Sequence, residues 1–186
     1  MKIIQLKSDD INRLNLLSTL HKKIFLGTIA TTLSVNNLSK LYGLLIKNKI
    51  ISVNVAFDED NKILGALTVK LDKNYRAVNF FDYFKILIIL IKGLLLHPAI
   101  WLTEYYYKIG LYKNIDSNVN IITLFVDQKH QSKGTGQNLI KSVINQYQTK
   151  ISVDTRTNNQ RAINFYIKNG FVLKNKNIRN TSLYFS

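Results

Sequence analysis

A segment in the third quarter of the chain has the residue types needed to bind an anion. Gln131-Ser132-Lys133-Gly134-Thr135-Gly136 follows a short apolar stretch and precedes an amphipathic one. Unpaired N–H groups at the start of a helix attract negative charge, and glycine lets a phosphate come close to the backbone. The spacing therefore predicts a phosphate-binding loop between a strand and a helix.

Two common phosphate loops do not fit this segment. A Walker A loop needs Lys and then Ser or Thr after its last glycine, but Gln137 and Asn138 follow Gly136. A dinucleotide-binding loop needs a third glycine where Leu139 stands. The loop must serve another phosphate-containing ligand.

A second segment, one strand further along, points to a family. Residues 159–171 read N-x-x-A-x-x-F-Y-x-x-x-G-F. Together with the Q-x-x-G-x-G loop, this segment resembles the GNAT superfamily of N-acetyltransferases. The resemblance is close over residues 120–171, and before them it rests on the order of elements alone. From the residues alone, the alternative is a glycine turn followed by an unrelated amphipathic helix.

The resemblance implies that the ligand is acetyl-CoA, used as a co-substrate without a metal. In this superfamily the central strand bulges and separates from its parallel neighbour, so the pantetheine arm would lie in the gap between them. The residues that the resemblance assigns to cofactor binding are Leu124, Phe125, Val126, Gln131, Ser132, Lys133, Gly134, Thr135, Gly136, Asn159 and Lys168.

Acyl transfer to an amine needs a donor for the developing oxyanion, an acid for the departing thiolate and a base for the amine. The resemblance implies the backbone N–H of Val126 as the donor and Tyr166 as the acid, although Tyr166 could instead be an aromatic core residue. Asn120 stands where many relatives carry a glutamate base. Glu104 and Asp154 are the carboxylates that remain, and a water chain without a dedicated base is the alternative.

The elements that must position these residues follow from hydrophobic periodicity. Strands are predicted over 1–6, 50–57, 63–69, 120–126, 151–155, 171–173 and 181–185, and helices over 11–25, 38–47, 80–96, 99–113, a run ending at 147, and 159–169. A strand, a helix and a strand in sequence predict a parallel pair. We expect an α/β (α+β) fold of one domain, residues 1–186. The resemblance implies a GNAT-like mixed central sheet in the order β-α-α-β-β-(helical insert)-β-α-β-α-β-β.

The predicted helical insertion at about residues 75–115 is the least ordinary stretch. Residues 80–96 are apolar nearly all round, with Lys85 and Lys92 as a narrow polar stripe, and Pro98 should end this helix. The apolar runs within Phe80 to Tyr112 are shorter than the ~20 residues of a bilayer span. A buried helix, a homodimer contact and a peripheral membrane contact stay open.

The composition excludes several classes of protein. The chain has 26 Lys and Arg against 11 Asp and Glu, a net charge of +15, but few arginines and scattered lysines, which argues against a nucleic-acid partner. The absence of cysteine excludes disulfides, thiolate metal sites and a Cys nucleophile. The first residues lack the pattern of a signal peptide, so a cytoplasmic protein is expected.

The acceptor amine is indicated only by the insertion. Its composition resembles that of GNAT proteins linked to surface-polysaccharide synthesis, which implies an amino sugar on a nucleotide carrier. A peptide or lysine amine is the second candidate. A module of another class, which binds acyl-CoA without turnover or associates with a membrane, is the remaining alternative.

Overall fold

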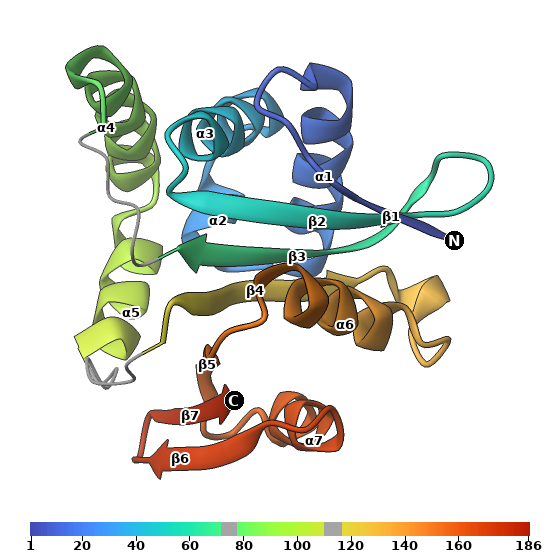
Figure 1. Ribbon diagram of the computed structural model, residues 1–186. Coiled ribbons are helices and arrows are strands. Elements are labelled where there is room, and N and C mark those ends of the chain that lie inside the picture. The colour runs from blue at the N-terminus through green and yellow to red at the C-terminus, as the bar shows by residue number, and fades with distance from the viewer. Residues whose placement is uncertain (72–77, 110–116) are drawn as a thin grey trace.

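The chain folds around one seven-stranded sheet in the computed structural model, which describes residues 1–71, 78–109 and 117–186 (Figure 1). The strand order is β1-β2-β3-β4-β5-β7-β6. The strands are β1 (Lys2–Gln5), β2 (Ile51–Phe57), β3 (Ile63–Leu71), β4 (Val119–Val126), β5 (Ile151–Arg156), β6 (Val172–Lys176) and β7 (Asn180–Phe185). The helices are α1 (Ile11–Ile24), α2 (Ile29–Thr32), α3 (Val35–Lys47), α4 (Phe80–Leu96), α5 (Pro98–Ile109), the 3-10 helix η1 (Gln128–His130), α6 (Thr135–Tyr147) and α7 (Gln160–Lys168).

The predicted α/β fold with a mixed sheet is confirmed, and β4 and β5 form its parallel pair. The α-helix α2 and the 3-10 helix η1 were not predicted. The four residues of α2 lie between α1 and α3 and are held by a capping box from Thr28 to Thr31. One helical turn is too short to show a hydrophobic period, so the sequence pattern gave no signal for it.

Apolar residues fill both faces of the sheet. On one face, Val53 and Val55 of β2 pack under α1 and α3. On the other face, Ala56 joins the cluster that contains Leu139 of α6 and Tyr166 of α7. Because successive residues of a strand point to opposite faces, β2 serves both clusters. The helices therefore cover the sheet as two layers, one on each side.

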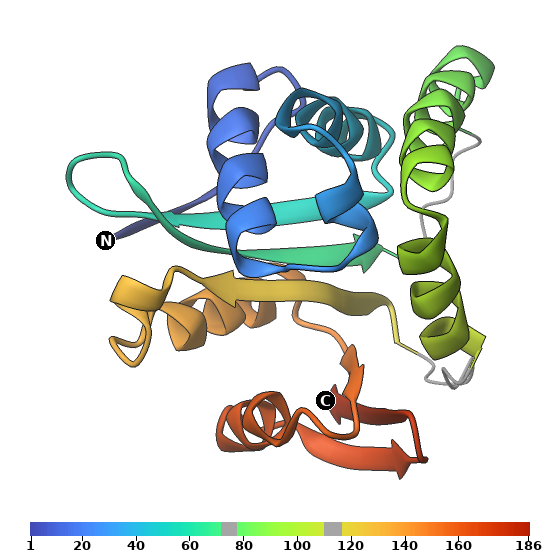
Figure 2. The same ribbon diagram turned by 180° about the vertical axis from the view of Figure 1, so that it is seen from behind.

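The insertion between β3 and β4 forms two helices, as predicted. Figures 1 and 2 show α4 and α5 as a column at one edge of the molecule, beyond the end of β3. The buried residues of α4 are Asp82, Ile89 and Gly93, so the expectation of a buried helix is wrong for most of its surface. Helix α4 ends before Pro98, as predicted. Tyr112, the end of the apolar stretch that begins at Phe80, lies outside the described residues.

Within the described parts of the chain, no single helix is long and apolar enough to cross a membrane. Helices α4 and α5 pass that test of length and composition only as a pair, and they are bent by 108° at the break between them.

Candidate active site

An opening between β4 and β5 forms the centre of the candidate site. These strands pair only over their first three residues and part after Ile121 and Val153. From there β4 follows β3 to Val126, while β5 follows β7 to Arg156. A register shift against β3 leaves Ile122 as an extra residue, which is a β-bulge. The bulge and the separation expected of the central strand are thus both present, and Figure 1 shows β5 to β7 turned away from β1 to β4.

The backbone of β4 offers hydrogen-bonding groups to this opening. Asp127 N donates to Leu64 O on the β3 side at 2.8 Å. In an antiparallel pair, successive residues direct their main-chain groups alternately toward the partner and away from it. Leu124 and Val126 therefore direct theirs toward β5, where pairing has ended. The N–H of Val126 thus points toward the opening.

Gln131 ties the end of β4 to α7. Its Nε2 donates to Val126 O at 3.1 Å, and its Oε1 accepts from Arg161 Nη2 at 2.6 Å. Arg161 was not among the predicted site residues, although it stands at a variable position of the N-x-x-A segment. A cation in the first turn of the helix that follows the strand after the glycine loop is the signal that could have indicated it. The structure therefore brings a guanidinium to the predicted phosphate loop.

The two glycines of the loop are required for different reasons. Gly134 precedes α6 with a φ of +81°, a left-handed conformation that favours glycine, and a Cβ there would meet nothing within 4 Å. A Cβ on Gly136 would lie 3.2 Å from Cζ of Phe165. Gly134 therefore keeps the loop open to a ligand, while Gly136 lets α6 approach α7. Ser132 and Lys133 are exposed beside Gly134, whereas Thr135 is buried.

Helix α7 begins and ends with side-chain and backbone caps. Oδ1 of Asn159 accepts from Ala162 N at 3.1 Å. At the other end Gly170, with a φ of +88°, closes a Schellman motif in which Phe171 N donates to Tyr166 O at 3.1 Å. Lys168 lies in the last turn and is exposed. Both ends of the helix are thus defined by local sequence.

Tyr166 is held by aromatic packing within α7 and the strand that follows. It is 6% exposed, and its ring centroid lies 5.5 Å from that of Phe165 and 5.3 Å from that of Phe171. Burial raises the pKa of Tyr166 above its ordinary value, so the hydroxyl is protonated at neutral pH. A tyrosine is protonated at neutral pH in any case, and the raised pKa makes this hydroxyl a weaker acid. What the packing supplies is a fixed ring.

Asp154 is the first residue of β5 after the last pair with β4. It lies on the opposite face of β5 from Val153, which packs in the α6–α7 cluster, and on the same face as Ser152 and Arg156. Ser182 on β7 donates a hydrogen bond to it. Asn120 stands where many relatives carry a glutamate base. Its Nδ2 donates to Ser152 Oγ at 2.8 Å, in the segment where β4 and β5 are paired.

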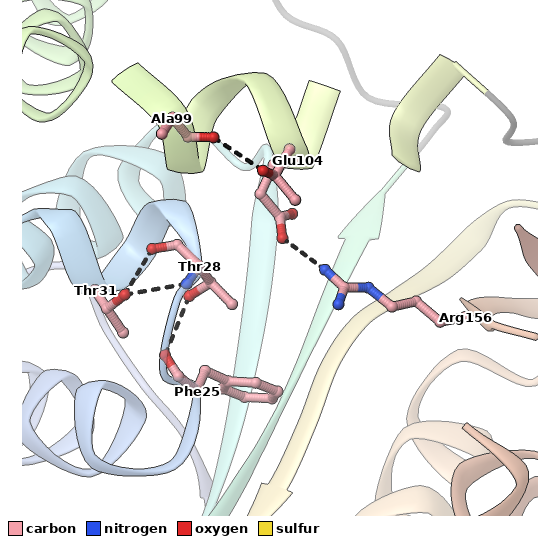
Figure 3. A network of polar contacts seen from close by, with 7 residues as sticks. Phe25, Thr28, Thr31, Ala99, Glu104 and Arg156 are labelled. Carbon is pink, nitrogen blue, oxygen red and sulfur yellow. Dashed lines mark hydrogen bonds and ion pairs between the residues drawn. The ribbon is translucent and has the colours of Figure 1, made fainter. Parts of the chain in front are cut away.

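Glu104 forms a contact that the sequence did not suggest. Its Oε1 lies 3.0 Å from Nη2 of Arg156, so an ion pair joins α5 of the insertion to the end of β5 (Figure 3). The same view shows the loop that leads into α2, where Phe25, Thr28 and Thr31 contact one another separately from this pair. One oxygen of Glu104 is thus engaged by a cation beside the opening, on the side of α1 to α3.

A buried histidine behind β4 was also missed. His21 Nδ1 and the hydroxyl of Tyr42 share a hydrogen bond of 2.6 Å, and the His21 ring lies 5.2 Å from that of Phe125. Burial lowers the pKa of His21 to about 4, so the imidazole is neutral at pH 7. The pairing joins α1 to α3 across 21 positions of sequence, and no local motif marks it.

Comparison with protein families agrees with the geometry of this segment. Residues 100–173 match the family described as acetyltransferase (GNAT) domain. The matched residues include β4, the glycine loop, α6, β5 and α7, so the segment that forms the candidate site is similar to a GNAT acetyltransferase domain. This assigns the protein to the acyltransferases. GNAT domains use acetyl-CoA. No curated protein sequence matches the chain.

Solved structures show the same fold over nearly the whole chain. An aminoglycoside acetyltransferase from an uncultured soil metagenomic sample, in complex with sisomicin, is 19% identical with a TM-score of 0.62, and the match covers 96% of this chain and 92% of that one. A spermidine N-acetyltransferase chimera from Vibrio cholerae and hSSAT is 15% identical with a TM-score of 0.58, covering 99% and 94%. NAA60 of Arabidopsis thaliana in complex with acetyl-CoA is 14% identical with a TM-score of 0.57, covering 99% and 97%. At these identities the likeness establishes the fold.

Proposed function

We propose that the chain transfers the acetyl group of acetyl-CoA to a primary amine by direct attack in a ternary complex. The observation that carries the proposal is the opening between β4 and β5, with the start of α6 beside it and the N–H of Val126 facing into it. The amine nitrogen bonds to the thioester carbon, the C–S bond breaks, and the thiolate leaves with a proton. A thioester in the opening would have its carbonyl oxygen within reach of this N–H.

The proposed co-substrate contacts follow the same path. The backbone of residues 124–126 would hold the pantetheine arm, and the loop of residues 131–136 would hold the pyrophosphate through N–H groups at the start of α6. Arg161 would add a positive charge at this loop, since it already contacts Gln131. Asn159 and Lys168 complete the proposed contacts, at the start and the end of α7.

The proton transfers need one acid and one base. Tyr166 is the proposed acid, because the resemblance assigns it this role and its ring is held in place by Phe165 and Phe171. Asp154 is the better placed of the two carboxylates, since it follows directly on the point where β5 leaves β4. Glu104 is engaged with Arg156 and is better suited to binding the acceptor. A water chain is the alternative to Asp154.

For the acceptor we propose a small molecule with an amino sugar, carried on a nucleotide. The Glu104–Arg156 pair presents both signs of charge beside the opening, which suits a substrate that carries an amine and a phosphate. Two of the similar solved structures, an aminoglycoside acetyltransferase and a spermidine N-acetyltransferase, also support a small amine as the acceptor. The neighbour NAA60 keeps a peptide amine as the second candidate.

The proposed place of action is the cytoplasm, where acetyl-CoA is available. Besides its substrates, the proposed binding partner of the chain is a membrane surface, contacted by the insertion. The exposed apolar face of the insertion suits a membrane better than a second copy of the chain.

Two measurements test this function. Titration calorimetry of the full chain with acetyl-CoA should give a Kd in the micromolar range, and a complete lack of binding would contradict the proposal. A screen that follows thiol release should then compare amino-sugar nucleotides, aminoglycosides, polyamines and peptides. We expect the highest kcat/KM for an amino-sugar nucleotide. Preference for peptides would favour the second candidate, and binding without any turnover would indicate a non-catalytic acyl-CoA-binding module.

A further inference from the structure

Helix α4 reverses the usual pattern of a surface helix: a charged side chain faces the protein, and large apolar side chains face outward. Its buried side includes the charged Asp82, which lies 2.8 Å from Nζ of Lys47 and 3.1 Å from Nδ2 of Asn48. Gly93, also buried, packs so closely that a Cβ there would lie 2.7 Å from Oγ1 of Thr32. These contacts with α3 and α2 fix which side of α4 faces the protein.

The outer face of α4 is wholly apolar. Six large side chains on it are each at least 40% exposed: Phe80, Phe81, Phe84, Ile88, Ile91 and Leu95. At 100° per residue they fall within an arc of about 100°. Leu102 and Tyr105 of α5, 68% and 64% exposed, extend the apolar surface past the bend. Patches of this kind on a protein surface mark an interaction site.

Charge distinguishes between the possible occupants of this face. Lys85 and Lys92 are exposed along its edge. The only acidic residues of α4 and α5 are Asp82 and Glu104, and each is paired with a basic side chain. The acidic turn of residues 58–60 lies at the far end of β3, whose nine residues span about 30 Å. The surroundings of the apolar face are therefore positively charged.

A second copy of the chain does not fit these charges. Each copy has a net charge of +15, which opposes self-association. An anionic lipid surface is attracted by the same charge and accepts aromatic and aliphatic side chains into its interface. We propose that the outer face of α4 binds the surface of an anionic phospholipid bilayer, with the helix lying in the interface rather than crossing it.

A position in the membrane interface explains why α4 and α5 together are as apolar as a transmembrane helix but do not form one straight helix. They pass a test of length and apolar composition only together, and the bend of 108° prevents a straight crossing. The ion pair of Glu104 joins the same insertion to Arg156 at the candidate active site. Lipid contact would therefore hold that site close to the membrane surface.

The test uses the full chain and vesicles of defined composition. Co-sedimentation at 0.1 M salt (~10 Å Debye length) with vesicles of phosphatidylglycerol and phosphatidylcholine should exceed that with phosphatidylcholine alone by at least about tenfold. The variant Phe84→Glu/Ile91→Glu should lose at least about tenfold of this binding. The matched control Leu26→Glu/Ile178→Glu also replaces two exposed apolar residues, away from α4, and should bind as the parent does.

A second pair of variants tests the contribution of charge. Lys85→Gln/Lys92→Gln should weaken binding by about fivefold per lysine, whereas Lys141→Gln/Lys150→Gln, also exposed, should change it little. Circular dichroism and the titration with acetyl-CoA establish that each variant is folded.

Two results would overturn the proposal. One is that the folded parent chain sediments with anionic vesicles no more than it sediments without vesicles. The other is a parent chain that is dimeric in sedimentation velocity and does not bind vesicles, while Phe84→Glu/Ile91→Glu is monomeric. The second result would assign the face to another copy of the chain.

Discussion

The carboxylate of Glu104, on α5 of the insertion, lies 3.0 Å from the guanidinium of Arg156, the last residue of β5. The two residues are 52 positions apart in the sequence, one in the helix that precedes β4 and the other in the strand that follows α6. This contact joins the insertion to the end of β5, on the side where the acceptor site is proposed. Its function can be tested separately from that of the co-substrate loop.

Glu104→Gln should raise the KM for the acceptor by about tenfold and leave the Kd for acetyl-CoA unchanged. The loss corresponds to about 1.4 kcal/mol of acceptor binding. The ion pair is partly exposed, so the free energy of unfolding should change by less than about 1 kcal/mol. Asp60→Asn in the Lys62–Asp60 pair of the β2–β3 turn is the matched control. An unchanged acceptor KM would remove Glu104 from the acceptor site.

Asp154→Asn should lower kcat by about 10²-fold, the usual contribution of a general base, with acetyl-CoA affinity retained. Steady-state kinetics over a range of pH would measure it. Ser182→Ala, which removes the hydroxyl that donates to Asp154, should have a smaller effect. If kcat is the same in Asp154→Asn and the parent enzyme, the amine is deprotonated through water.

Tyr166→Phe should slow turnover by about 10²-fold without weakening acetyl-CoA binding, because only the proton for the thiolate is lost. The ring contacts with Phe165 and Phe171 remain, so the free energy of unfolding should stay nearly unchanged. Tyr184→Phe, in β7, serves as the control. Full activity in Tyr166→Phe would leave this residue a purely structural role.

The two loop glycines should respond differently to alanine. Gly134→Ala forces a side chain into a left-handed conformation, at about 1–2 kcal/mol, and should weaken acetyl-CoA binding by about tenfold. Gly136→Ala should mainly lower the free energy of unfolding, through its contact with Phe165. Calorimetry and urea denaturation separate these effects. Phe165→Leu should restore the stability of Gly136→Ala, and a failure of this rescue would contradict the packing explanation.

His21 should make stability depend on pH below neutrality. Its pKa is lowered from 6.5 to about 4 by burial, so between these values the unfolded chain binds a proton that the folded chain does not. The stabilisation is complete above about pH 6.5 and is lost as the pH falls toward 4, by up to about 3 kcal/mol. Urea denaturation of the parent and His21→Gln would measure it. Equal slopes with pH in both proteins would contradict the assignment.

Local sequence accounts for much of the fold and for the glycine loop. The strand, glycine loop and helix of residues 120–147 were predicted, as were the start and end of α7, because caps and hydrophobic periods involve neighbouring residues. The short α2 was missed because one turn shows no period. The expectation of a buried α4 was wrong because its pattern does not tell which side faces the protein. That side is chosen by Lys47, Asn48 and Gly93.

What the sequence determined by itself was the order of elements, the Q-x-x-G-x-G loop and the N-x-x-A-x-x-F-Y segment. The tertiary structure decided the rest: the parting of β4 and β5 after Ile121, the position of Arg161 at the loop, and the pairing of Glu104 with Arg156. The reason is physical. Caps and periods depend on residues a few positions apart, whereas an opening in a sheet or a distant ion pair depends on how whole elements pack.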